Sequence, residues 1–169
     1  MKKILILLFL FLLVPVVRAE EEDLAPNAKS AIMIEASTGE ILFQKNKDEK
    51  LAPASMTKMM SMLLIMEEIE NGNLKWDEMI TASERAASMG GSQIFLKVGE
   101  KMSVTDMVKG ISIASGNDAT VAMAERISGS EESFVKKMND RAKELGLKNT
   151  NFINATGLTA DNHYSSAND

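Results

Sequence analysis

The residues most able to do chemistry begin with a serine and a lysine in residues 53–58. Ser55 stands where a predicted helix begins, and Lys58 follows three residues later. Side chains at this spacing share one face of a helix, so the amine can reach the hydroxyl. A lysine can take the proton of a serine hydroxyl when burial and the field at a helix N-terminus lower its pKa. The spacing therefore indicates a nucleophile and its base.

A second polar segment, Ser115-Gly116-Asn117, follows sixty residues later. It lies between two predicted helices, where a glycine lets the chain turn sharply and both polar side chains can project. The alternative is a capping turn, in which Asn117 or Asp118 caps the next helix.

Ser133 and Lys136 repeat the spacing of Ser55 and Lys58. Average residue usage gives on the order of one chance Ser-x-x-Lys match in a chain of this length. The second pair lies inside a predicted amphipathic helix, where both side chains are expected to face solvent. The helix start at Ser55 favours the first pair as the reactive one.

The composition removes several kinds of site. The chain has 169 residues, no Cys and one His, His163. Thiol nucleophiles, disulfides and cysteine zinc sites are excluded, and a Ser-His-Asp triad would have to use His163. We interpret His163 as a packed or surface loop residue and expect neither a metal nor an organic cofactor.

The N-terminus has the pattern of a secretory signal. Lys2 and Lys3 precede an apolar run at residues 4–17, and small residues lead up to Ala19. The run is shorter than the roughly 20 residues of a membrane span, so cleavage after Ala19 is expected. Residues 1–19 are therefore predicted to be a signal peptide, residues 20–28 a spacer and residues 29–169 the folded domain.

The charge of the exported part argues against nucleic acid as a partner. Without residues 1–19 the chain carries 16 basic and 24 acidic residues, a net charge of about −8. Such a surface repels a phosphate backbone.

Local patterns predict an α+β fold with a hairpin before a block of helices. Residues 30–36 and 40–44 are predicted strands joined by a turn. A helix is predicted from Ser55 to Asn71, and others at 103–114, 119–127 and 130–146. The residues expected to pack in the core, rather than line a binding groove, are Met59, Met62, Leu63, Met66 and Ile69 on the first helix and Phe134, Met138, Ala142 and Leu145 on the last.

Together, Ser55-x-x-Lys58 and Ser115-Gly116-Asn117 resemble the first two of three motifs of the penicillin-recognising serine enzymes. Residues 51–58, 113–119, 154–158 and 165–167 look like the low-molecular-mass penicillin-binding D-alanyl-D-alanine carboxypeptidases of peptidase family S11. This resemblance implies a β-lactamase/transpeptidase-like (DD-peptidase) fold.

The resemblance also implies a reaction. Ser55 would attack the carbonyl between two D-alanines and form an acyl-enzyme, with Lys58 as its base. Ser115 would pass a proton to the leaving amine, and Asn117 would orient Lys58 and the substrate amide. The implied partners are peptidoglycan stem peptides ending in D-Ala-D-Ala and β-lactam antibiotics. The implied place is the outer face of the bacterial membrane, the cell wall or the periplasm, and membrane-surface association is compatible with it.

The third family motif, Lys-Thr-Gly, does not occur in the sequence. The chain is therefore expected to be an inactive fragment that ends before the remaining sheet strands. Two alternatives stay open, a class A β-lactamase-like hydrolase and a noncatalytic exported cell-wall binding module. Ser-Gly-Asn in place of Ser-Asp-Asn favours the carboxypeptidase over the β-lactamase.

Overall fold

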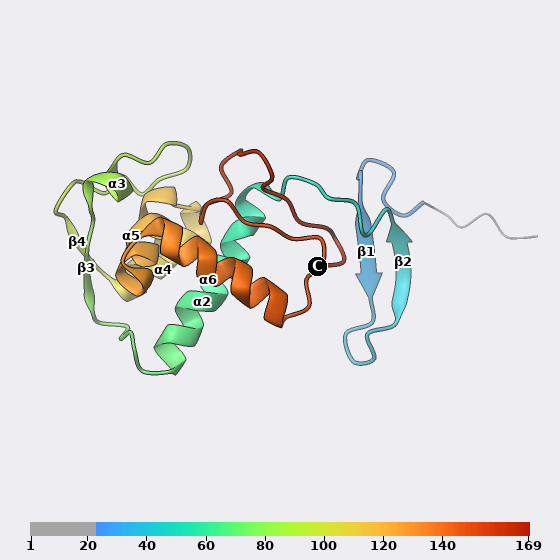
Figure 1. Cartoon of the computed structure of the whole chain (residues 1–169), viewed down its shortest axis with the longest axis horizontal. Helices are drawn as coiled ribbons and strands as arrows, with labels where there is room; N and C mark the ends of the chain where they lie inside the picture. Colours follow the sequence, from blue (N-terminus) through green and yellow to red (C-terminus); the bar gives the residue numbers. More distant parts are fainter. Residues whose placement is uncertain (1–22) are drawn as a thin grey trace, which may run out of the picture.

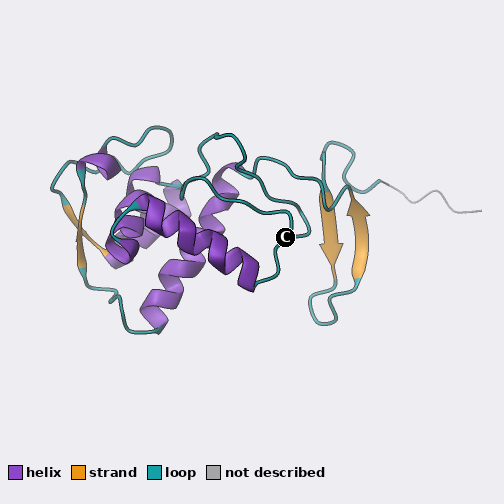
Figure 2. Cartoon of the chain, in the orientation of Figure 1, coloured by secondary structure: helices purple, strands orange, loops and turns teal. Residues whose placement is uncertain are grey.

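The computed structural model describes residues 23–169, and the predicted signal peptide at 1–19 lies outside the described residues. A hairpin stands at one end of the molecule and a helical body at the other (Figure 1). A second pair of short strands lies at the far end of the helical body (Figure 2). Among the described residues, no helix is both long enough and apolar enough to cross a membrane.

The N-terminal hairpin forms as predicted, with slightly shorter strands. Strands β1 (Ala31–Ile34) and β2 (Ile41–Lys45) pair in antiparallel fashion. The Glu35 carboxylate closes the turn by accepting hydrogen bonds from the hydroxyl of Ser37 and from the backbone N–H groups of Ser37 and Thr38. These bonds lower the pKa of Glu35 to about 2.

The first long helix begins with a tighter turn than predicted. Residues Ala54–Thr57 form the 3₁₀ turn η1, and α2 then runs from Lys58–Glu70. The helix ends before Asn71 and Gly72, as predicted. Ser55 therefore lies on the 3₁₀ turn ahead of the α-helix.

The predicted core face of α2 is partly wrong. Met62, Met66 and Ile69 pack against the core, but Met59 is 73% exposed and Leu63 is 37% exposed. Apolar residues surround this helix on nearly all sides, so their spacing does not single out one stripe. Met59 and Leu63 instead line a groove of about 670 Å³ beside the C-terminal segment.

The three later helices are confirmed with small changes in their bounds. They are α4 (Val104–Ala114), α5 (Asn117–Ser128) and α6 (Glu131–Glu144). The hydroxyls of Ser103 and Ser130 accept backbone N–H bonds at the starts of α4 and α6.

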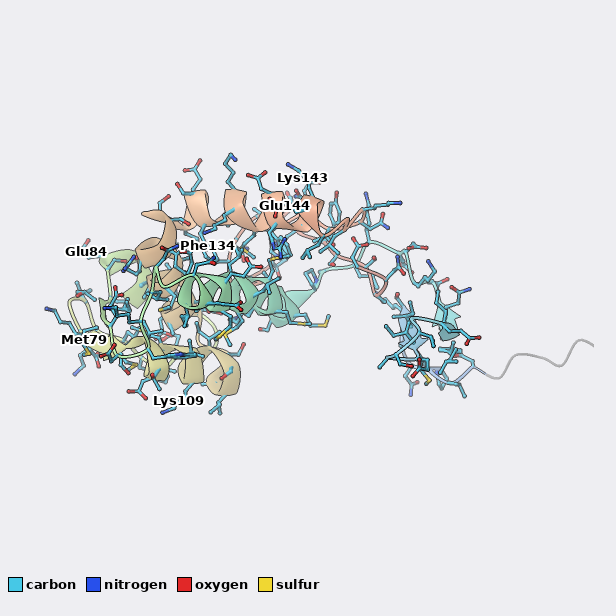
Figure 3. All side chains as sticks on the ribbon, turned by 90° about the horizontal axis from the view of Figure 1, so that it is seen from below. Met79, Glu84, Lys109, Phe134, Lys143 and Glu144 are labelled. Atoms are coloured by element: carbon cyan, nitrogen blue, oxygen red, sulfur yellow. The ribbon has the colours of Figure 1, made fainter. Side chains whose placement is uncertain are left out.

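The predicted core stripe of α6 is confirmed except at its end. Phe134, Met138 and Ala142 are buried, but Leu145 is 45% exposed. Leu145 follows the last helical residue, so it leaves the buried face. Figure 3 shows Phe134 on the side of α6 that faces the helical body, whereas Lys143 lies on its outer side.

Three short elements were not predicted. Strands β3 (Met79–Thr81) and β4 (Lys101–Ser103) pair in antiparallel fashion, and α3 (Glu84–Ala87) lies between them in the chain. Each strand has only three residues, which is too short for a clear alternating pattern.

Two neighbouring clusters of buried side chains hold the helical body together. One joins α2, α4 and α5 with the second strand pair, and the other joins α2, α5 and α6 with residues 152–155. Residues 145–169 contain no helix or strand and run back along the body toward the hairpin (Figure 2). One isolated β-bridge joins Ser165 of this segment to Leu51, and another joins Tyr164 to Asn151 within the segment.

Candidate active site

The predicted nucleophile lies on a strained and exposed turn. Ala54, the residue before Ser55, has φ +48°, a left-handed conformation that an alanine adopts at a cost of about 1 kcal/mol or more. Ser55 itself is exposed. A Cβ placed on Gly157 would lie 1.8 Å from the Ala54 carbonyl oxygen, so Gly157 packs directly on this turn. The turn that carries Ser55 is therefore held in place by a residue outside the Ser-x-x-Lys motif.

The predicted base lies under the nucleophile. Lys58 is 5% exposed, and its Nζ lies 3.5 Å from Ser55 Oγ. The Lys58 Nζ donates a shorter bond of 2.7 Å to the backbone oxygen of Thr156. Burial lowers the pKa of Lys58, because the surroundings disfavour the charged amine. The two groups are within hydrogen-bond distance, and burial favours the neutral form of the amine.

Asn154 shapes the loop that receives the lysine. Its Oδ1 accepts hydrogen bonds from the backbone N–H groups of Thr156 and Gly157, and its Nδ2 donates to the Leu158 oxygen. The Thr156 carbonyl is thereby directed toward the amine of Lys58. In the sequence, these residues were singled out through the family resemblance.

The second predicted serine ends α4 in a conformation that is rare for a serine. Ser115 has φ +55°. The Gly116 N–H donates to the Gly110 oxygen and closes the helix end. The Ser115 hydroxyl oxygen is buried and has no hydrogen-bond partner among residues 23–169.

Asn117 is the first residue of α5 and is 4% exposed. Its Nδ2 donates to the Gly90 oxygen over 2.7 Å, and its backbone N–H donates to the Ser92 oxygen. A Cβ on Gly91 would come within 2.9 Å of that Nδ2. Residues 90–92 therefore fix Asn117 tightly.

Asp118 holds the loop next to Asn117. Its buried carboxylate accepts backbone N–H bonds from Ile94 and Leu96, which flank Phe95. Phe95 has φ +62° and is 79% exposed. Neither Asn117 nor Asp118 is the N-cap of α5, because that position is Gly116, but the Asp118 carboxylate does accept the first-turn N–H of Ala119.

The two motifs approach each other through these loops. A Cβ on Gly91, beside Asn117, would lie 3.6 Å from the side chain of Leu158, and the adjacent Gly157 packs on the turn of Ser55. Figure 1 shows the C-terminal segment in red passing the N-terminal end of α2. Within residues 23–169, Lys58 Nζ bonds to Ser55 and Thr156 and does not bond to Asn117.

The other predicted positions are readily placed. Ser133 and Lys136 are exposed on α6, as expected for a surface pair, and Lys136 pairs with Asp140. His163 is packed rather than exposed, at 6% exposure. In the part of the chain that the structure describes, no three His, Asp or Glu side chains gather as metal ligands would.

Comparison with known proteins gives the family. The sequence profile described as "Peptidase_S11: D-alanyl-D-alanine carboxypeptidase" matches residues 16–169. The chain is 66% identical to D-alanyl-D-alanine carboxypeptidase DacF of Bacillus subtilis over 147 residues, which cover 87% of this chain and 38% of that protein. It is 41% identical to DacC of Escherichia coli over 170 residues, which cover 95% of this chain and 42% of that protein. The chain thus spans about two fifths of the length of these relatives.

Solved structures agree with the sequence comparison. The carboxypeptidase DacD of Francisella tularensis superposes with a TM-score of 0.84 at 43% identity, covering 90% of this chain and 37% of that one. Penicillin-binding protein 5 of Haemophilus influenzae superposes with a TM-score of 0.81 at 39% identity, covering 83% of this chain and 42% of that one. The predicted α+β DD-peptidase fold is confirmed. The chain belongs to the peptidase S11 family of D-alanyl-D-alanine carboxypeptidases.

Proposed function

We propose that the protein containing this chain is a serine-type D-Ala-D-Ala carboxypeptidase that removes the terminal D-alanine from peptidoglycan stem peptides. The observation that carries this proposal is the exposed Ser55 hydroxyl above a buried Lys58 amine, 3.5 Å apart. Family membership names the substrate, because the similar proteins are D-alanyl-D-alanine carboxypeptidases. β-Lactams would acylate the same serine, since similar structures are penicillin-binding proteins.

The proposed reaction has two halves. Lys58 takes the Ser55 proton as Oγ attacks the carbonyl carbon between the two D-alanines. The carbon–nitrogen bond breaks, D-alanine leaves with a proton delivered through the Ser115 hydroxyl, and an ester remains on Ser55. Water then hydrolyses the ester and restores the serine.

The surrounding residues would stabilise this reaction. The backbone N–H of Ser55 would donate to the developing oxyanion, as one half of an oxyanion hole. Asn117 would contact the substrate amide, whereas Lys58 is oriented by the Thr156 oxygen and does not bond to Asn117 among the described residues. Its fixed position against residues 90–92 supports such a role, because a preorganised group loses little entropy on binding.

We also propose where the protein acts. A signal peptide at residues 1–19, a spacer at 20–28 and a catalytic domain from residue 29 would place Ser55 outside the cytoplasmic membrane, facing the cell wall or the periplasm. The substrate class supports this location, because peptidoglycan stem peptides lie outside the membrane. Association with the membrane surface would be compatible with it.

The test is D-alanine release from an acyl-Lys-D-Ala-D-Ala tripeptide by the protein expressed from its complete reading frame. Ser55→Ala should abolish release, whereas Ser133→Ala, the same change in the surface pair, should leave it unchanged. Rapid β-lactam turnover without D-alanine release would instead identify a β-lactamase-like hydrolase. Binding to isolated cell walls without either reaction would identify a noncatalytic module.

A further inference from the structure

The single histidine of the chain lies between the nucleophile turn and the C-terminal segment. His163 is 6% exposed, and its Nε2 lies 2.8 Å from Oγ1 of Thr57, a residue inside the Ser-x-x-Lys motif. Its Nδ1 accepts the backbone N–H of Ile153 over 3.1 Å. The ring also meets Phe152 edge to face, with centroids 5.9 Å apart. Both ring nitrogens therefore have a hydrogen-bond partner.

These two contacts fix the protonation state of the ring. A backbone N–H can only donate, so Nδ1 must be the unprotonated nitrogen. The single ring proton is then on Nε2, which donates it to the Thr57 hydroxyl. Burial lowers the pKa of His163, in agreement with a neutral ring. A doubly protonated ring would place Nδ1–H against the N–H of Ile153.

The two partners of His163 belong to the two segments that set the position of Lys58. Thr57 is 1% exposed and directly precedes Lys58, at the end of the turn that carries Ser55. Ile153 begins the loop in which the Thr156 backbone oxygen accepts a hydrogen bond from the Lys58 amine. His163 thus links the nucleophile turn to the loop that anchors its base.

We propose that His163 is a positioning residue. Its neutral imidazole bridges the turn at Thr57 and the loop at residues 153–157, and this bridge keeps the Lys58 amine within reach of Ser55. The proposal rests on the proposed function, since it assigns His163 a role in the acylation of Ser55. His163 does not itself contact the reacting atoms.

The His163 bridge is consistent with the close packing of the turn and the loop. A Cβ on Gly157 would lie 3.0 Å from Thr57 Oγ1, as well as 1.8 Å from the Ala54 oxygen. The Thr57 hydroxyl is therefore confined between the glycine of the loop and the imidazole. If the hydrogen bond to the imidazole were lost, the turn and the loop could separate. The Lys58 amine would then no longer be held within reach of the Ser55 hydroxyl.

The test compares Thr57→Val, which keeps the shape of the side chain and removes the hydroxyl, with Thr57→Ser, which keeps the hydroxyl. The rate constant for acylation by fluorescent penicillin is measured on the protein from its complete reading frame. Thr57→Val should acylate about tenfold more slowly, because a displaced base loses its near-attack geometry. Thr57→Ser should recover most of the rate. Thr105→Val, which removes a threonine hydroxyl bonded to the Trp76 oxygen far from Ser55, is the matched control.

A second measurement separates positioning from general stability. His163→Gln and His163→Phe are compared for acylation rate and for melting temperature, and only Gln offers both a donor and an acceptor. The proposal requires Gln to acylate faster than Phe when each is measured well below its melting temperature. Equal acylation rates for Thr57→Val and the wild type would overturn the inference. Failure of the wild type itself to acylate would overturn the proposed function instead.

Discussion

Two Ser-x-x-Lys segments with the same spacing have opposite environments. Lys58 is 5% exposed and donates to Ser55 and to a backbone oxygen of a distant loop. Lys136 has a side chain that is 80% exposed, and its amine pairs with Asp140 one turn further along α6. Ser133 is exposed on the same helix. Spacing alone therefore does not make a base, because the amine must also be buried, and burial lowers the pKa of Lys58.

The difference comes from the rest of the chain and not from either motif. The loop at residues 154–157 supplies the oxygen that Lys58 binds and the glycine that packs on the turn before Ser55. Among residues 23–169, no comparable loop covers Lys136. A reactive pair thus needs a second segment that buries the lysine and fixes the serine.

The largest expected effect is on the base. Lys58→Met keeps a long, flexible side chain but removes the amine, so acylation by penicillin should fall by about 10³-fold. Lys136→Met makes the same change in the exposed pair and should leave the rate unchanged. Stopped-flow or gel-based acylation kinetics measure both. A Lys58→Met variant that kept a tenth of the wild-type rate would show that another group serves as the base.

The next effect is on the packing of the loop. Gly157→Ala must overcome both a φ of +86° and an overlap with the Ala54 oxygen, so unfolding free energy should fall by at least about 3 kcal/mol. Gly129→Ala has a similar φ of +79° but open space around it, and should cost only about 1 kcal/mol. Urea denaturation compares the two variants. Similar losses would mean that the turn of Ser55 is not clamped by Gly157.

The smallest effect is a dependence of stability on pH. Burial lowers the pKa of His163 in the folded state, so the unfolded chain binds the proton first as the pH falls. Stability should therefore decrease below the ordinary histidine pKa of about 6.5 and stop decreasing below the folded-state pKa. The slope is at most about 1.4 kcal/mol per pH unit for one proton.

Thermal unfolding between pH 7.5 and pH 5 tests this dependence. The decrease should be smaller in His163→Gln, which has no proton to gain. Lowered carboxylate pKa values, such as that of Glu35, act mainly at lower pH. The buried Lys58 amine also has a lowered pKa, and the comparison with His163→Gln isolates the part that comes from the histidine. An identical decrease in both proteins would remove His163 as its source.

Local signals were sufficient to predict much of the fold. The hydroxyls of Ser103 and Ser130 mark the starts of two helices, and residues Asn71 and Gly72 mark the end of another. Capping and turn chemistry involve neighbours within a few residues, so they can be read from one stretch of sequence. The prediction of Ser55 and Lys58 as a nucleophile and its base used the same kind of local spacing.

Contacts between distant residues could not be predicted from the pattern. The bond between Lys58 and Thr156 joins residues 98 apart, and the bond between Thr57 and His163 joins residues 106 apart. The exposed Met59 was also misplaced, because residues from outside α2 decide which of its apolar sides is covered. These long-range contacts distinguish the buried pair from the exposed one.

The most direct test is to find which serine a penicillin acylates. The protein from its complete reading frame is incubated with penicillin, digested and analysed by mass spectrometry for the adduct. We predict an adduct on the peptide containing Ser55, none on the peptide containing Ser133, and no labelling of the Ser55→Ala variant. An adduct on any other serine, or labelling that survives Ser55→Ala, would contradict the assignment of Ser55 as the nucleophile.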